Sequence, residues 1–125
     1  CLDDAVEYSK VRVQFDRPIG SFQAIKHKCA DILLEVESAR AAVLYAASRA
    51  MDPDDAELSI CASATASYCG LAYTHAAKEN IQIHGGIGFT WEHDAHLHLK
   101  RAKTSELLFG APATHRARVA DLVGI

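Results

Sequence analysis

Three closely spaced histidines with acidic neighbours form the densest group of potential metal ligands in this sequence of 125 residues. The group consists of Glu92, His93, Asp94, His96 and His98. Imidazole and carboxylate groups suit zinc or a similar ion. On a helix, side chains three or four positions apart share a face, so His93 and His96 would converge while His98 would point elsewhere. No H-E-x-x-H pattern occurs. We therefore favour solvated or interface histidines over a metal site.

A glycine-rich stretch, Gly85–Gly88, lies a few residues upstream of these histidines. Glycine-rich loops cradle phosphates when they connect a strand to a helix. Here the stretch follows a predicted helix, so the context of a dinucleotide or phosphate loop is missing. By itself the stretch is also compatible with glycines that only cap a long helix and turn the chain.

Helical periodicity dominates the chain and predicts the elements that position these residues. Leu2–Val13 has a plausible apolar stripe, which fails where Asp16–Pro18 forces an extended turn. Over Phe22–Ala50, apolar or small residues recur in alternating steps of three and four. This heptad seam predicts a helix about 45 Å long, which Ser21 can cap and Met51–Asp55 ends. The seam consists of Phe22, Ile25, Cys29, Ile32, Val36, Ala39, Val43, Ala46 and Ala50.

Three further helices are predicted downstream. The first runs from about Ala56 to Ile83 and is rich in small residues, which let helices approach closely. The next spans Asp94–Leu108, and a terminal helix, Ala113–Leu122, follows an interruption at Gly110–Pro112. We therefore predict an all-α fold, an antiparallel four-helix bundle with no strands. On the first of these helices, the residues predicted to form one packing stripe are Cys61, Ala64, Tyr68, Leu71 and His75.

The composition fits one compact domain, because 50% of the residues are apolar. A balance of 13 basic against 16 acidic residues gives a formal charge of -3, which offers no field to recruit nucleic acid or an anionic membrane. No apolar run approaches the roughly 18 to 20 residues needed to span a bilayer, and the first residues do not resemble a signal peptide. We expect a cytoplasmic protein. Because a helical pattern begins at once after Cys1, we expect residues 1–125 to be one domain of a longer chain.

The cysteines show no spacing typical of a metal or redox site. C-x-x-C patterns are absent, and most of the cysteines stand at apolar positions of helical patterns, where a free thiol behaves as a small hydrophobe. We therefore expect buried thiols at Cys1, Cys29, Cys61 and Cys69.

Four stretches, in the right order, resemble the C-terminal helical domain of acyl-CoA dehydrogenases, flavoproteins that desaturate acyl-CoA thioesters. Arg12–Gln23 is similar to the pattern R-x-x-F-G-x-x-I-x-x-F-Q of that family, and Ala30–Asp31 matches its A-D pair. Gln82–Phe89 matches Q-x-x-G-G-x-G-F, and Leu99–Lys103 parallels the basic element L-x-R-D-A-K. Because the agreement spans nearly the whole chain with the right separations, the sequence is identified as a member of this family.

The resemblance implies an FAD site shared between subunits. In this family the C-terminal bundle of one subunit reaches the adenosine diphosphate half of its neighbour's flavin, and dimers pair into tetramers through the bundle. Arg12 would pair with the pyrophosphate as a planar cationic donor, and Phe15 would pack on the cofactor. The alternatives are an exposed surface arginine and a phenylalanine used in ordinary core packing. Neutral hydrogen bonds and close backbone approach would come from Gln14, Gln23, Gln82, Gly85 and Gly86.

The usual catalytic base of the family is missing from its expected position. Desaturation needs a carboxylate to remove the proton α to the thioester carbonyl while the β-hydride goes to the flavin. Counted from Gly86, the glutamate of the family's Y-E-G-T element falls on Phe109 and the threonine falls on Ala111. A phenylalanine cannot accept a proton, and Glu106 would need a different local path to substitute. We therefore assign no catalytic residue to this chain.

Three interpretations stay open. In the first, the base lies upstream of Cys1, as in some relatives, and the whole protein is an ordinary dehydrogenase. In the second, slightly favoured by the two departures in one element, this subunit is non-catalytic and completes the flavin site of a homologue in a heterotetramer, as in bacterial dehydrogenases of steroid-derived side chains. Both imply acyl-CoA as substrate and, as partners, homologous subunits and an electron-transfer flavoprotein. In the third, the chain is a helical oligomerisation module without flavin, which leaves Arg12–Gln23 and the double glycine without a purpose.

Overall fold

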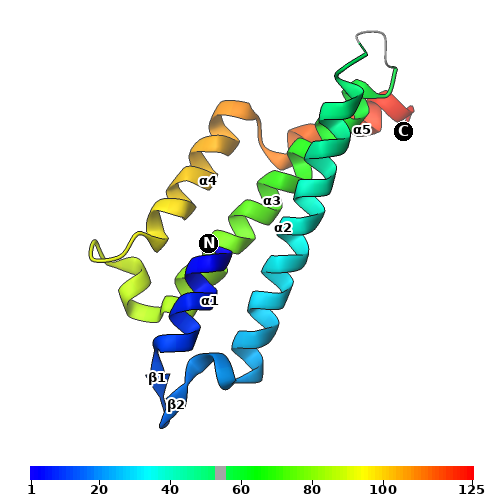
Figure 1. Cartoon of the computed structure of the whole chain (residues 1–125). Coiled ribbons are helices and arrows are strands. Elements are labelled where there is room, and N and C mark those ends of the chain that lie inside the picture. Colours follow the sequence, from blue (N-terminus) through cyan, green and yellow to red (C-terminus); the bar gives the residue numbers. More distant parts are fainter. Residues whose placement is uncertain (53–55) are drawn as a thin grey trace.

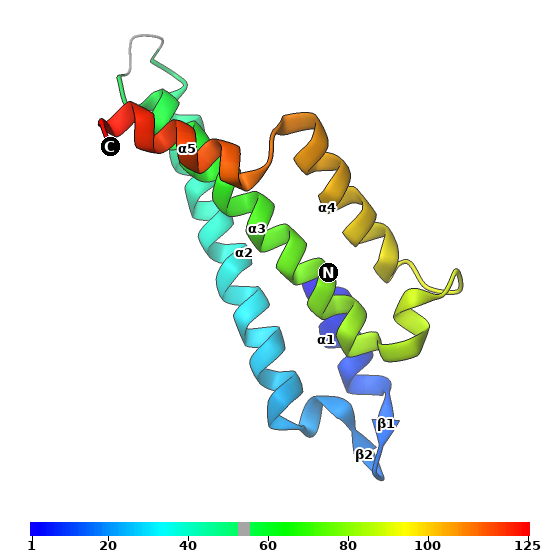
Figure 2. The same ribbon diagram turned by 180° about the vertical axis from the view of Figure 1, so that it is seen from behind.

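The computed structural model describes residues 1–52 and 56–125 and shows an antiparallel helical bundle (Figure 1), which confirms the predicted all-α fold. Two helices of 27 residues, α2 (Gln23–Arg49) and α3 (Leu58–His84), run side by side in opposite directions. α1 (Leu2–Val11) and α4 (Ala95–Phe109) pack along α3. Figure 2 shows α5 (Pro112–Val123) crossing the end of the bundle opposite the α1–α2 connection.

The connection between α1 and α2 is a small β-hairpin, so the prediction of a bundle without strands is wrong at this place. β1 (Val13–Gln14) pairs with β2 (Arg17–Pro18) in antiparallel register. Extended backbone is favoured here because a proline restricts the residue before it to the β region. The Ile19 N–H donates a hydrogen bond of 2.8 Å to the Arg12 carbonyl and closes the base of the hairpin. The hairpin therefore forms one end of the molecule (Figure 1).

The hydrophobic core lies between α1, α2, α3 and the short 3-10 helix η1 (Ile19–Ser21) that follows the hairpin. The first half of the predicted seam faces this core, with Ile32 fully buried and Val36 packed against it. Further along, Val43 is 49% exposed and lines a cavity between helices. The buried side chains of the core are Ala5, Ile19, Ile32, Ala76 and Ile83.

The buried surface of α3 differs from the predicted stripe. Tyr68 and Leu71 were expected to pack in the bundle, but they are 38% and 50% exposed. α3 contacts all four other helices. The side chains of α3 that are buried by these neighbours are mostly small or polar. The prediction of the α3 packing face is therefore wrong. The buried positions of α3 are Ser63, Ser67, Ala72, Thr74, Ala76, Ala77, Asn80, Ile83 and His84.

The predicted helix boundaries agree with the observed ones within two residues, the margin expected for helix ends. Ser21 does not cap α2: it belongs to η1, and Phe22 occupies the N-cap position with no side-chain cap hydrogen bond. α2 ends at Arg49, close to the predicted breaker segment Met51–Asp55, of which residues 53–55 lie outside the described part of the chain.

The four cysteines are free and each is half-buried, so the prediction of buried thiols is wrong in degree. Burial still raises the pKa of the Cys29 and Cys69 thiols above their usual range. Among the helices of the described residues, none combines the length and the apolar character that a membrane crossing requires.

Candidate functional site

The first part of the site is formed where α1 gives way to the hairpin. Arg12 leaves the helix with φ -73° and ψ 121°, while its N–H still donates to the Tyr8 carbonyl at 2.9 Å. The chain reverses at Phe15 and Asp16, whose φ angles are 53° and 61°. Asp16 stands where the family pattern has glycine, and aspartate tolerates this left-handed region better than most residues.

Phe15 has an unusual backbone conformation. A left-handed backbone conformation costs an ordinary residue roughly 1–2 kcal/mol. The side chain does not recover this cost by burial, because it is 85% exposed and touches the Phe22 ring edge-on at 6.0 Å between centroids. Exposed strain of this kind clusters at binding sites. The hairpin therefore presents an exposed aromatic ring at the surface of the molecule.

The second part of the site is the turn after α3, where η2 (Gly85–Phe89) begins. Gly85 has φ +63°, a conformation that favours glycine. Gly88 is needed for packing, because a Cβ there would lie 2.8 Å from the His84 Cβ and 2.9 Å from the Ile81 carbonyl oxygen. Neither reason applies to Gly86, which has a negative φ and no atom within 4 Å of its would-be Cβ. No contact among the described residues accounts for glycine at position 86.

The two parts meet around one open cavity of about 450 Å³. Four of the seven residues predicted to bind a cofactor line it: Arg12, Gln14, Gly85 and Gly86. The other three, Phe15, Gln23 and Gln82, are exposed on the neighbouring surface and do not line it. The structure thus joins two motifs that are far apart in sequence. The cavity lining is completed by Tyr8, Ile19, Ile83, His84 and Ile87, which the sequence analysis did not identify.

His84 is the most distinctive of these additional residues. It is only 4% exposed, its ring stacks on Tyr8 at 4.2 Å between centroids, and its Nδ1 donates to the Asn80 carbonyl at 2.8 Å. Burial lowers the pKa of His84 below its usual value near 6.5, and the neighbouring His93 lowers it further. The neutral ring is therefore the form that the fold favours. Its position directly before the double glycine is the sequence signal that could have identified it.

The three histidines predicted to be solvated or interface residues have partners inside the molecule instead. The His93 ring lies 4.1 Å from that of His84, and His98 Nε2 lies 3.3 Å from an Asp4 carboxylate oxygen. His96 is 8% exposed and packs edge-on against Trp91. Among the residues that the structure describes, no three His, Cys, Asp or Glu side chains are grouped so as to hold a metal ion.

Comparison with known proteins identifies the fold and its motifs together. The family model for the C-terminal domain of acyl-CoA dehydrogenases matches residues 1–124 of this sequence. The chain belongs to the acyl-CoA dehydrogenase family.

Its relatives are much longer than this domain. It is 55% identical over 101 residues to acyl-CoA dehydrogenase FadE34 of Mycobacterium tuberculosis, covering 81% of this chain and 14% of that protein. It is 47% identical to acyl-CoA dehydrogenase IpdE2 of the same organism, covering 90% of this chain and 33% of that one. Among solved structures, the ChsE4–ChsE5 complex from Mycobacterium tuberculosis superposes with a TM-score of 0.89 at 32% identity, covering 98% of this chain and 33% of that one. The chain thus spans a third or less of each of these proteins.

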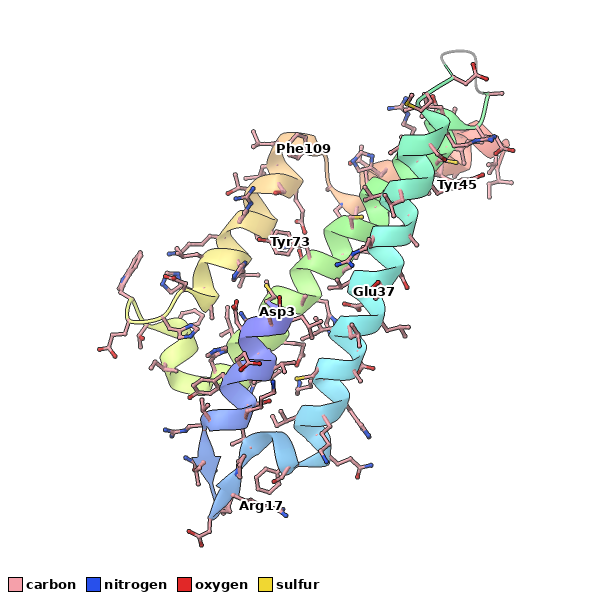
Figure 3. The ribbon with its side chains drawn as sticks, viewed as in Figure 1. Asp3, Arg17, Glu37, Tyr45, Tyr73 and Phe109 are labelled. Atoms are coloured by element: carbon pink, nitrogen blue, oxygen red, sulfur yellow. The ribbon has the colours of Figure 1, made fainter. Side chains whose placement is uncertain are left out.

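The end of α4 in this acyl-CoA dehydrogenase domain lies far from the glycine turn. Figure 3 shows Phe109 towards one end of the bundle and Arg17 of the hairpin at the opposite end. Phe109 is 75% exposed and, together with Glu106, lines an apolar cavity of about 530 Å³ bordered by α2, α3, α4 and Gly110. The base position and the glycine turn of one chain therefore border different cavities.

Glu106 is the carboxylate nearest in sequence to the missing base. Its side chain accepts hydrogen bonds from Lys103 Nζ at 2.9 Å and from Thr74 Oγ1 at 2.8 Å. These hydrogen bonds, that of Lys103 foremost, lower the pKa of Glu106 below its usual range. A carboxylate stabilised in this way is a weaker proton acceptor than a free one.

Proposed function

We propose that this domain belongs to an FAD-dependent acyl-CoA dehydrogenase, which catalyses the α,β-desaturation of acyl-CoA thioesters, and that it binds FAD across a subunit interface. The observation that carries the proposal is the cavity at which Arg12, Gln14 and the Gly85–Gly86 backbone converge. When bound, the flavin supplies the hydride acceptor of the reaction. The residues of this chain would hold its adenosine diphosphate half.

The charge and shape of the site suit a pyrophosphate. Arg12 has an exposed side chain and forms no ion pair with any described residue, so its guanidinium is available for a charge-assisted, bidentate interaction with phosphate oxygens. The open space at Gly86 admits a ligand atom against the backbone, which a side chain would prevent. Phe15 offers an exposed ring beside this cavity, and Gln14, Gln23 and Gln82 offer neutral hydrogen-bonding groups.

The separation of the two ends supports binding across an interface. The cavity at the hairpin and the glycine turn does not include Phe109 of the same chain, which lines a separate cavity at the far end of α4 (Figure 3). The hairpin end would therefore serve a neighbouring subunit. Exposed apolar side chains on α2, among them Leu34 at 69% and Leu44 at 66% exposure, provide surface for the association that this arrangement needs.

We further propose that the α4 end of this chain supplies no catalytic base. Phe109 cannot accept a proton, and Glu106 is engaged by Lys103 and Thr74. The base then comes from a region N-terminal to Cys1 or from a homologous catalytic subunit. We favour the second arrangement, a heterotetramer, and the likeness to a complex named for two proteins, ChsE4 and ChsE5, is consistent with it. An electron-transfer flavoprotein is the expected partner that removes the electrons.

The test is to purify the full-length protein alone and together with the product of an adjacent homologous gene, and to measure flavin absorbance and acyl-CoA oxidation with an artificial electron acceptor. Flavin and activity only in the joint preparation would support the heteromeric arrangement. Flavin and activity in the protein alone would refute the non-catalytic role and support an upstream base. Flavin in neither preparation would refute FAD binding and favour a bare oligomerisation module.

A further inference from the structure

A cluster of three rings connects the segments that border the candidate flavin cavity. Tyr8 belongs to α1, one turn before Arg12, and His84 is the last residue of α3, directly before Gly85. His93 belongs to the loop that leads into α4. The His84 ring contacts both of the others, 4.2 Å from the Tyr8 centroid and 4.1 Å from the His93 centroid, and the Tyr8 and His93 rings meet edge-on at 6.5 Å. The relative position of Arg12 and the glycine turn therefore depends on His84.

The hydrogen bonds of the two histidines define which ring nitrogens carry protons, and that of His93 requires a neutral ring. His84 Nδ1 donates to the Asn80 carbonyl, an acceptor only, at 2.8 Å. His93 Nδ1 accepts from the Ala95 backbone N–H at 3.1 Å, so this nitrogen must carry a lone pair. Protonation of His93 at Nδ1 would break the bond that holds the start of α4. Two imidazolium rings at 4.1 Å would also repel each other.

The surroundings of the cluster are strongly charged on one side. His84 also borders a second, polar cavity of about 550 Å³. Among the described residues, the titratable and charged groups that border a cavity together with His84 or act on its charge are Asp4, Glu7, Tyr8, Arg12, Glu92, His93, Asp94, His98 and the amino group of Cys1. The hydrogen bond to the Asn80 carbonyl and the Asp4 carboxylate favour a proton on His84. Burial, which has the largest effect, opposes it together with His93 and the amino group of Cys1, so the pKa of His84 is lowered overall.

We propose that His84 is a positioning residue for the flavin site. As a neutral ring packed against Tyr8 and His93, it holds the glycine turn beside Arg12, and protonation of His84 releases that turn. The proposal rests on the proposed function, because it assumes that the cavity binds flavin. It adds a residue that the sequence analysis did not identify as part of the site, and a dependence of flavin retention on pH.

The direction of this dependence follows from the lowered pKa of His84. In the unfolded chain His84 titrates near its usual value of 6.5, and in the folded protein it titrates lower. Its contribution to holding the site is therefore fully present above about pH 6.5 and is lost as the pH falls through the folded-state pKa. For one linked proton, the effect is limited to about tenfold for each pH unit within that window.

The experiment measures the rate of flavin release from the full-length protein, in its heteromeric form if flavin requires it, between pH 7.5 and pH 5.0. Released flavin is followed by its fluorescence, and the unfolding temperature is recorded at each pH. His84→Phe keeps an aromatic ring in the cluster but removes the titration, and His84→Ala removes both. His27→Phe, at an exposed histidine on α2, is the matched control.

We expect release from the unmodified protein to accelerate as the pH falls, release from His84→Phe to accelerate less steeply, and release from His84→Ala to be faster at every pH. His27→Phe should follow the unmodified protein. If His84→Phe does not fold, His84→Gln replaces it, since glutamine retains a donor for the Asn80 carbonyl.

Two results would separate the possible failures. Parallel pH profiles for the unmodified protein and the His84 variant, with flavin bound in both, would overturn the positioning role and leave the proposed function intact. Absence of flavin from the unmodified protein at every pH would overturn the proposed function, and this inference with it.

Discussion

The glycines of the turn after α3 provide a direct test of which backbone atoms serve the fold and which serve a ligand. Gly86→Ala adds a methyl group where no protein atom lies within 4 Å, at a negative φ. We expect the apoprotein to keep its stability or to gain up to about 1 kcal/mol, since alanine reduces the entropy of the unfolded chain. Gly88→Ala is the matched control with the opposite expectation.

At Gly88 the added Cβ would lie 2.8 Å from the His84 Cβ and 2.9 Å from the Ile81 carbonyl oxygen. Both atoms are fixed by the backbone of α3 and cannot rotate away. Overpacking of this kind costs about 1–3 kcal/mol. We therefore expect a correspondingly lower free energy of unfolding for Gly88→Ala. In Gly86→Ala, the added methyl group would collide in the same way with a ligand bound closely against residue 86. An overpacking cost of the same size corresponds to a dissociation constant about 5-fold to 150-fold higher.

The assay uses the full-length protein with its partner subunit where flavin binding requires it. Denaturant unfolding of the apoprotein gives stability, and titration with FAD, followed by fluorescence quenching, gives affinity. If Gly86→Ala bound flavin as tightly as the unmodified protein, the glycine backbone would not contact the cofactor. If Gly88→Ala were as stable as Gly86→Ala, the packing argument for the turn would fail.

Three further variants test other parts of the proposal. Arg12→Ala should weaken flavin binding about 10-fold to 150-fold, the range for losing hydrogen bonds to a charged group, and Arg12→Lys should recover only part of this; unchanged flavin content would contradict the pyrophosphate role. Phe109→Glu should create no acyl-CoA oxidation by itself in a dye-linked assay, and a large gain would contradict a base located elsewhere. Lys103 and Thr74 lower the pKa of Glu106. Its carboxylate therefore stabilises the fold at pH values above the usual pKa near 4.5, and this contribution is lost as the pH falls through the lowered pKa. Glu106→Gln should therefore lower the unfolding temperature at pH 7 and have a smaller effect in acid; an equal effect at both would argue against the ionised pairing.

Much of the bundle could be predicted from the order of residues because helix formation depends on local spacing. The seam over Phe22–Ala50 predicted α2 almost to its ends, since positions three and four apart must share a face. The packing face of α3 could not be predicted in this way. Tyr68 and Leu71 look like core residues in sequence, but four neighbouring helices surround α3 and bury its smaller residues instead. Helix periodicity specifies one face, whereas a central helix has several.

The family was determined by the sequence alone, because the order and separation of Arg12–Gln23 and Gln82–Phe89 are those of acyl-CoA dehydrogenases, and these motifs carry the prediction of a cofactor site. Only the tertiary structure decided that the two motifs share a cavity, since their meeting depends on the packing of α1 against α3. It also decided that the His84 ring packs against those of Tyr8 and His93, because ring contacts between three separate segments leave no periodic signal in the sequence. The distance of Phe109 from that cavity is likewise a property of the fold, set by the length and direction of α4 (Figure 3).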